Sequence, residues 1–343
     1  MLEIKDLKTF LGSPKNIVIT THTNPDADAL GSSLGLRKYL IKKGHSVTVI
    51  SPTHYPKFLH WMEGNDEVVI FSKTKKKEID LLIHGADIIF CLDFNSLQRI
   101  DSMENVIRKS KAEKVLIDHH LDPEHFADYE LSSIDAAATA ELIYEFIVSL
   151  GDREMIDKGI AECLYAGIMT DTGQFKHNNV TQNVHFVTAN LMALGADTAR
   201  VGSLIYDNNS IDRIKFLGYA LYRKLTFLPE YSTAYIVLSA QDQNKFNAEA
   251  GDMEGLVNYA LSLNDVVLAA LISDREEGVK LSFRSKGEFS VNDFARKHFS
   301  GGGHKNAAGG SSDLDIEETV LKFIGIIKEY REELNSYKNE MQN

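Results

Sequence analysis

Aspartate and histidine side chains follow four apolar stretches in the first half of the sequence. They are His22, Asp26 and Asp28 after the first stretch, Asp93 after the second, Asp118, His119 and His120 after the third, and Asp171 after the fourth. If these segments converge, several carboxylates come within a few ångströms of one another, and like charges at that range raise each other's pKa or require counter-cations. A capping aspartate or a hydrogen-bonded core histidine could explain any single member, but the whole set in this order indicates a metal centre.

The ligand types narrow the choice of metal. Carboxylates and imidazoles without a thiolate suit manganese, with magnesium, cobalt or iron as substitutes. Six or more candidate ligands exceed what one ion needs. We therefore expect two divalent ions about 3.5–4 Å apart that share a bridging carboxylate, an arrangement used for the hydrolysis of phosphate esters.

The apolar stretches predict the elements that must position these side chains. Strands are predicted at 17–19, 46–50, 67–71, 86–93 and 114–118, and helices at 28–43, 136–150, 154–169 and 182–194. This alternation predicts an α/β fold with a mostly parallel sheet covered by helices on both faces, and such sheets bind ligands at the carboxyl ends of their strands. Small residues in the 28–43 helix, among them Gly31 and Gly35, suit either an anion at the helix N-terminus or close packing on the sheet.

The second half predicts a smaller α/β domain. Strands are expected at 234–238, 266–272 and 279–283, and helices at 211–225, 254–263, 291–299 and from 317 to about 337. Because no Gly/Ser-rich linker separates the halves, we expect a catalytic domain at 1–190, a helical linker at 191–215 and a substrate-binding domain at 216–343.

Two features of the second half suit a phosphorylated ligand. Backbone amides at Gly301, Gly302 and Gly303 can approach a phosphate or base closely, and His304 follows directly. Arg284 supplies a guanidinium fork that matches phosphate. A plain tight turn would also explain the glycines.

Composition limits the class of partner and the location. The net charge is −12, from 37 basic and 49 acidic residues, whereas long nucleic acids are usually bound by a basic face. The two cysteines, Cys91 and Cys163, lie in apolar segments, which argues against a disulfide framework. The sequence shows neither a stretch of about 20 apolar residues nor a signal peptide. We therefore expect a cytoplasmic protein that acts on small phosphorylated molecules, with no membrane partner.

Taken together, the motifs resemble a known family. His22-x-x-x-Asp26-x-Asp28, Asp93, Asp118-His119-His120 and Asp171 resemble the four motifs of the DHH phosphoesterase superfamily, and Gly301-Gly302-Gly303-His304 with Ala307-Ala308-Gly309-Gly310 resembles the C-terminal domain often attached to it. The similarity covers essentially the whole chain. Its size and glycine–histidine motif are most similar to the standalone oligoribonuclease and pAp phosphatase branch (nanoRNase type), whose manganese-dependent enzymes cut very short RNAs from an end and convert 3′-phosphoadenosine 5′-phosphate (pAp) to AMP.

The resemblance implies a role for each residue. One metal would be held by His22, Asp26 and Asp93, and the other by Asp28, Asp93, His119 and Asp171. His120 would face the scissile phosphate, Asp118 would orient a ligand histidine, and Arg284 with the Gly301–His304 motif would bind the non-scissile end of the substrate. A hydroxide between the two metals would attack the phosphorus in line, while the metals and His120 stabilise the developing charge.

Several alternatives stay open. Among enzymes, the nearest is a standalone phosphodiesterase that acts on cyclic di-AMP or its linear product pApA. An inorganic pyrophosphatase shares the metal motifs but not the glycine–histidine motif, and the acidic charge disfavours a long-strand DNA exonuclease. A nucleotide-binding sensor is the non-enzymatic alternative, although such modules tend to lose metal ligands. The expected partners are short RNA oligonucleotides and small nucleotides, and a homodimer is compatible with these features.

Overall fold

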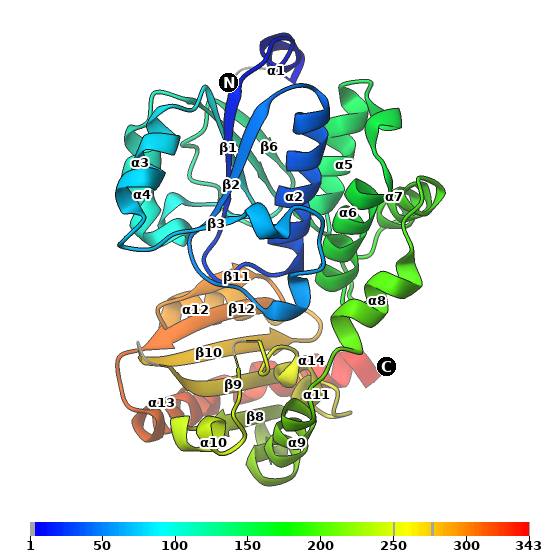
Figure 1. Ribbon diagram of the computed structural model, residues 1–343. Coiled ribbons are helices and arrows are strands. Elements are labelled where there is room, and N and C mark those ends of the chain that lie inside the picture. Colours follow the sequence, from blue (N-terminus) through cyan, green and yellow to red (C-terminus); the bar gives the residue numbers. More distant parts are fainter. Residues whose placement is uncertain (1–3, 250, 276–277, 343) are drawn as a thin grey trace. The chain divides into compact units, whose positions relative to one another are not determined.

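The chain folds into two compact units. The computed structural model describes residues 4–249, 251–275 and 278–342, and it divides the chain into Met1–Asn208 and Asn209–Asn343 (Figure 1). Within the described ranges, none of the helices has both the length and the apolar character that a membrane span needs.

The first unit is built on a six-stranded parallel sheet with the strand order β3-β2-β1-β4-β5-β6. Its strands are β1 (Asn16–Thr21), β2 (Ser46–Ser51), β3 (Val69–Ile70), β4 (Ile88–Leu92), β5 (Glu113–Asp118) and β6 (Tyr129–Ser132). Its helices are α1 (Ile4–Phe10), α2 (Ala27–Lys42), α3 (Lys76–His84), α4 (Glu104–Lys109), α5 (Thr139–Ser149), α6 (Lys158–Asp171), α7 (Gln182–Ala193) and α8 (Thr198–Tyr206).

Helices cover both faces of this sheet. Successive residues of each central strand point to opposite faces, and both sets are apolar. In β1, Ile17 and Ile19 pack with α2, α5 and α6, whereas Val18 packs with α3 and α4 on the other face. Figure 1 shows the two layers of helices on opposite sides of the sheet. The predicted fold class is therefore confirmed.

Most predicted elements of the first unit are present, but some differ from the prediction. The strand expected at 67–71 is only the two-residue β3, because Asn65–Glu67 forms a 3-10 turn. The edge strand β6 was not predicted from the sequence. The helix expected from 154 begins at Lys158, where the Asp157 side chain accepts a hydrogen bond from the Ile160 amide and caps it.

The small residues of α2 allow that helix to pack closely against α6. A Cβ atom on Gly31 would lie 2.3 Å from the carbonyl oxygen of Cys163 in α6. On the facing helix, a Cβ on Gly167 would lie 2.5 Å from the Oδ1 atom of Asp28. Close packing therefore accounts for Gly31, but the packing partner is a neighbouring helix and not the sheet.

The second unit contains a mixed sheet with the order β11-β12-β10-β9-β8-β7, in which only β8 and β9 are parallel. Its strands are β7 (Leu225–Leu228), β8 (Thr233–Leu238), β9 (Leu268–Arg275), β10 (Gly278–Ser285), β11 (Gly302–His304) and β12 (Ala307–Ser312). Its helices are α9 (Ile211–Tyr219), α10 (Ala240–Lys245), α11 (Leu256–Leu261), α12 (Val291–His298), α13 (Ile316–Glu329) and α14 (Arg331–Gln342).

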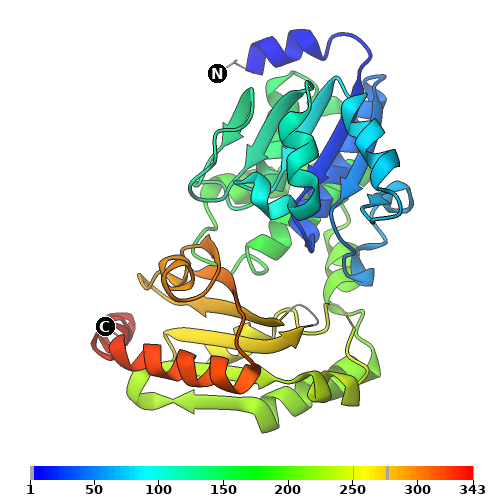
Figure 2. The ribbon, with the colours of Figure 1, turned by 90° about the vertical axis from the view of Figure 1, so that its left-hand side faces the viewer.

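Helices cover both faces of the second sheet as well. Phe283 of β10 packs with Phe294 of α12 and Phe323 of α13 on one face, and Figure 2 shows α13 along the sheet. On the other face, α9 and α11 pack on β8 and β9. The hairpin of β11 and β12 and the strand β7 were not predicted, and the terminal helix expected from 317 to 337 is interrupted at Tyr330.

The contact between α2 and α6 leads to a prediction about stability. Gly31→Ala places its Cβ against a backbone carbonyl that cannot move without shifting α6, so the free energy of unfolding should fall by about 2–3 kcal/mol in urea titrations. Gly202→Ala in α8 is the matched control, because nothing lies within 4 Å of its added Cβ, and it should gain about 0.5–1 kcal/mol. Equal stability of the Gly31 variant and the wild type would contradict this packing.

Candidate metal centre

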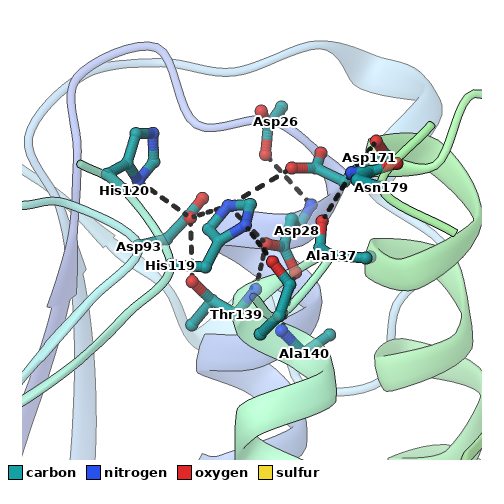
Figure 3. A network of polar contacts seen from close by, with 12 residues as sticks. Asp26, Asp28, Asp93, His119, His120, Ala137, Thr139, Ala140, Asp171 and Asn179 are labelled. Atoms are coloured by element: carbon teal, nitrogen blue, oxygen red, sulfur yellow. Dashed lines mark hydrogen bonds and ion pairs between the residues drawn. The ribbon is translucent and has the colours of Figure 1, made fainter. Parts of the chain in front are cut away.

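The predicted metal ligands lie together at the carboxyl edge of the first sheet. Figure 3 labels Asp26, Asp28, Asp93, His119 and Asp171 among them. They come from the neighbouring strands β1, β4 and β5 and from two helices. His22 and Asp26 follow β1, Asp93 follows β4, His119 follows β5, Asp28 lies in the first turn of α2, and Asp171 ends α6. The sequence predicted each group at the end of a buried element, and the structure confirms the helix that was predicted before Asp171.

The six side chains form two groups of donor atoms. His22, Asp26 and Asp93 offer atoms within 4.8 Å of one another, and so do Asp28, His119 and Asp171. Asp93 also faces the second group, because its Oδ1 lies 3.4 Å from the Nε2 of His119 while its Oδ2 lies 3.3 Å from the Nε2 of His22. The Nε2 of His119 is 3.4 Å from Asp171 Oδ2. One carboxylate therefore stands between two sets of ligands.

Both imidazoles are oriented by backbone carbonyls. The Nδ1 atom of His22 lies 2.8 Å from the carbonyl oxygen of Thr23, and the Nδ1 of His119 lies 3.3 Å from that of Ala136. Because a carbonyl can only accept, Nδ1 carries a proton and Nε2 is directed at the carboxylates. Nε2 donates to Asp93 when it is protonated, and its lone pair would bind a divalent ion once that proton is lost. Metal-binding histidines are commonly held in this way, so the donor set fits divalent ions.

The N-terminus of α5 holds the buried Asp28 carboxylate. Its Oδ2 accepts a hydrogen bond from the Thr139 amide at 2.6 Å, and its Oδ1 accepts one from the Ala140 amide at 2.8 Å. These amides have no partner within the helix, and the helix dipole favours a negative charge there. The same Thr139 donates its hydroxyl to Asp93 Oδ1 at 2.9 Å. One residue thus connects two candidate ligand carboxylates.

Asp93 has an unusual backbone conformation. Its φ angle is +64°, in the left-handed region that residues with a Cβ rarely adopt. The Asp93 amide donates to the carbonyl oxygen of Ile117 in β5 at 3.1 Å, which fixes this conformation against the neighbouring strand. Backbone strain of this kind concentrates at functional sites.

Burial and mutual repulsion shift the pKa values of the carboxyls. Burial, followed by the charge of Asp93, raises the pKa of Asp28 to about 8. Burial and the charges of Asp28 and Asp26 also raise the pKa of Asp171 well above its ordinary value. Burial alone would raise the pKa of Asp93 as well, but hydrogen bonds from His119 and His22 hold it well below that value.

The histidine beside Asp93 shows the opposite balance. Burial alone would lower the pKa of His119, but the hydrogen bond and charge of Asp93 raise it to about 10. The cluster therefore retains protons near neutral pH unless another positive charge is supplied. A divalent ion would displace those protons.

Asp118 and His120 form a buried pair beside Asp93, whose Oδ1 lies 3.8 Å from the Nδ1 of His120. The Asp118 Oδ1 lies 2.7 Å from the Nδ1 of His120, whereas its Oδ2 has no hydrogen-bond partner in the described part of the chain. The resemblance implied that Asp118 orients a ligand histidine, but its partner is His120, because residues two apart in an extended segment point the same way. Burial lowers the pKa of His120 although the ring donates a hydrogen bond to Asp118, so its imidazole is neutral at pH 7.

The predicted substrate residues lie in the second unit. In the sheet, His304 is directly opposite Ala307, which is opposite Arg284. Residues paired in this way point to the same face of a sheet, so Arg284 and His304 flank the small Ala307 on one surface.

The glycines, however, belong to a hairpin and not to an open loop. A Cβ on Gly301 would lie 2.0 Å from the carbonyl oxygen of Gly309, and one on Gly303 would lie 2.5 Å from that of Ala307. The Gly303 amide donates to Asn292 Oδ1 at 2.8 Å. The close approach of β11 to β12 therefore accounts for Gly301 and Gly303. Because the Gly303 amide is bonded to Asn292, it is not among the amides expected to bind a phosphate. A Cβ on Gly302 would meet only side chains.

Two positioning side chains were missed in the sequence. Thr139 lies among alanines at a predicted helix start, where nothing signals a contact with Asp28 across 111 residues. Asn179 donates to the carbonyl oxygens of Asp171 and Ala137, each at 3.3 Å, and so joins the end of α6 to the start of α5 (Figure 3). Both act through tertiary contacts that local patterns do not encode.

The hydrogen bond from Thr139 to Asp93 leads to a prediction about metal binding. Thr139→Val removes the hydroxyl but keeps the shape, so the affinity for Mn²⁺ should fall by about 10–100-fold. Thr139→Ser keeps the hydroxyl and should bind nearly as tightly as the wild type. Calorimetric titration of the metal-free protein measures both. Equal weakening by the two variants, or none by either, would contradict the positioning role.

Comparison with known proteins agrees with this geometry. The model of the DHH family, N-terminal domain, matches residues 16–168, and the DHHA1 domain model matches residues 231–332. The chain is 28% identical over 321 residues to the bifunctional oligoribonuclease and PAP phosphatase NrnA of Thermus thermophilus, covering 91% of this chain and 89% of that protein. It is 26% identical over 342 residues to the cyclic-di-AMP phosphodiesterase GdpP of Bacillus subtilis, covering 95% of this chain but 49% of GdpP.

A solved structure is similar over nearly the full length. The crystal structure of an exopolyphosphatase-related protein from Bacteroides fragilis has a TM-score of 0.91 and 37% sequence identity, and the match covers 97% of each chain. Both halves of the sequence are thus accounted for by known relatives. This chain belongs to the DHH family of phosphoesterases and carries a DHHA1 domain in its second half.

Proposed function

We propose that this protein is a metal-dependent phosphoesterase that hydrolyses short oligoribonucleotides to mononucleotides and pAp to AMP. The observation that carries the proposal is the presence of two adjacent ligand groups, with Asp93 a member of the first and facing His119 of the second. The relative from Thermus thermophilus, whose name gives both activities, supports the choice of substrates because the similarity extends over 91% of this chain.

The six clustered side chains would hold two divalent ions. His22, Asp26 and Asp93 would bind one, and Asp28, His119 and Asp171 would bind the other with Asp93 shared. Bound divalent ions neutralise phosphate charge and lower the pKa of coordinated water. Mixed oxygen and imidazole ligands favour manganese among the candidate ions.

The protein's own residues would orient the substrate and stabilise the developing charge. Asp118 accepts a hydrogen bond from the Nδ1–H of His120 and so fixes the orientation of that ring. When a phosphate arrives, its negative charge raises the pKa of His120 and favours the protonated form. His120 would then donate a hydrogen bond to a phosphate oxygen, where negative charge increases in the transition state.

Arg284 and His304 would determine which substrates bind. They lie on one face of the second sheet with only Ala307 between them. A guanidinium fork matches a phosphate bidentately, so we assign Arg284 and His304 to the non-scissile phosphate or its neighbouring base.

The cytoplasmic location, the homodimer and the residue ranges of the domains also remain predictions.

The alternative substrate is a cyclic dinucleotide. The similarity to GdpP favours it, but this chain spans about half the length of that relative. Rates on pAp, on RNAs of two to five nucleotides and on cyclic di-AMP, measured side by side with Mn²⁺, separate the two activities. We expect faster turnover of pAp and short RNA, and faster turnover of cyclic di-AMP would replace the proposal with the alternative.

The central position of Asp93 predicts a large loss of activity on substitution. Asp93→Ala removes the shared carboxylate, so hydrolysis of pAp should fall by about a thousandfold, and addition of Mn²⁺ should no longer raise the melting temperature. The circular dichroism spectrum should stay unchanged. Asp66→Ala, at an exposed position in the same unit, is the control and should behave as the wild type. More than a tenth of wild-type activity in the Asp93 variant would rule out the shared role.

The assignment of Arg284 predicts a change in substrate binding. Arg284→Lys keeps the charge but loses the fork, so KM for pAp should rise about tenfold with a smaller change in kcat. Lys280→Gln, on the same strand, serves as the control and should leave both constants unchanged. If KM stays constant while kcat falls, Arg284 does not hold the ground-state substrate.

A further inference from the structure

A basic groove lies wholly within the second unit. It has a volume of about 520 Å³ and is open to solvent. Its lining comes from the end of α12 and the following turn, the end of β12 and the following turn, and α13. These residues are Arg296, Lys297, His298, Phe299, Ser300, Ser311, Ser312, Asp313, Leu314 and Lys322. We call this feature the α12–α13 groove. Its volume is within the range of small-ligand sites.

The charge of the groove is opposite to that of the chain. Arg296, Lys297 and Lys322 contribute three positive charges and Asp313 one negative charge, although the whole chain carries −12. His298 adds none at pH 7, because burial and the nearby charge of Lys297 lower its pKa. A local excess of cations on an acidic protein concentrates anions at that place.

The two lysines are held in position without a carboxylate partner. The Nζ of Lys297 lies 3.3 Å from the Tyr330 hydroxyl and 5.5 Å from the centre of that ring. The Nζ of Lys322 lies 4.8 Å from the centre of the Phe299 ring. Across the described ranges, no acidic oxygen lies within 4.0 Å of either amine. Because these amines are already held in place, the two lysine side chains would lose less conformational entropy when an anion binds.

The groove is separate from the surface assigned to the substrate. Phe283 points toward α12 and α13, and neighbouring residues of a strand point to opposite faces, so Arg284 and its row partners face away from the groove. The groove still adjoins the hairpin, because a Cβ on Gly302 would lie 3.4 Å from the Nε of Arg296. The exposed Ser300, whose backbone pairs with that of Ser311, adds a hydroxyl to its lining.

We propose that the α12–α13 groove is a second phosphate-binding site that takes the phosphates of a short single-stranded RNA. The proposal rests on the proposed function for the identity of the RNA. The groove itself supplies the chemistry: two fixed amines, a guanidinium and the Ser300 hydroxyl around an open space of nucleotide size. RNA that occupies it would bind more tightly than pAp or free phosphate, because it offers several phosphates at once.

The test is the affinity of the full-length chain for RNA. A fluorescein-labelled five-nucleotide RNA is titrated by anisotropy in EDTA, which prevents hydrolysis, at several salt concentrations. Lys297→Gln/Lys322→Gln should weaken binding about tenfold at low salt, and it should reduce the slope of log K against log salt by about 1.4, since each phosphate contact on a single strand contributes about 0.7. Lys328→Gln, on α13 outside the groove lining, should change neither quantity.

Competition and activity identify the ligand and separate the two proposals. Inorganic phosphate and pAp should displace the RNA only at much higher concentrations, and displacement by phosphate at equal concentration would overturn the assignment to RNA. Unchanged affinity and salt slope in the double variant would overturn the groove site.

With Mn²⁺ added, the double variant should hydrolyse pAp at the wild-type rate. If neither the wild type nor the double variant hydrolyses pAp, the proposed function fails, while the RNA-binding result still decides whether the groove is a phosphate site. If the double variant melts early, Lys322→Glu alone replaces it.

Discussion

Repulsion among buried carboxylates is the constraint on which the first unit depends. Asp28, Asp93 and Asp171 share a pocket with two imidazoles, and burial raises the pKa values of Asp28 and Asp171. Such a cluster is stable only if positive charge balances it, from retained protons or from cations. The parallel strands β1, β4 and β5 bring the negative charges together at one edge. The fold thus produces an excess of negative charge that a bound metal would neutralise.

Backbone amides at the start of a neighbouring helix stabilise part of this negative charge. The N-terminus of α5 donates two amides to Asp28, and the hydroxyl of Thr139 in the same helix donates to Asp93. This arrangement requires α2 and α6 to pack closely. A Cβ atom added to Gly31 or to Gly167 would clash with an atom of the facing helix. The position of the Asp28 carboxylate therefore depends on the packing of α2 against α6, both at Gly31 and at Gly167, which lies directly against Asp28.

Local sequence patterns predicted the parts of this structure that depend on local chemistry. The apolar runs before Asp93 and Asp118 indicated the strands, and the types of side chain after them indicated a metal centre. Features that depend on distant contacts were missed. Thr139 has no signal because its partner is 111 residues away, the φ angle of Asp93 depends on β5, and the glycines of β11 were interpreted as a loop because their pairing with β12 is not visible in a glycine-rich sequence.

Anomalous diffraction from crystals grown with Mn²⁺ tests the central claim most directly. The account predicts two manganese peaks, one beside His22 and Asp26 and the other beside Asp28, His119 and Asp171, with Asp93 in contact with both. A single peak that leaves Asp93 without a metal contact, or no peak within this cluster, would contradict it.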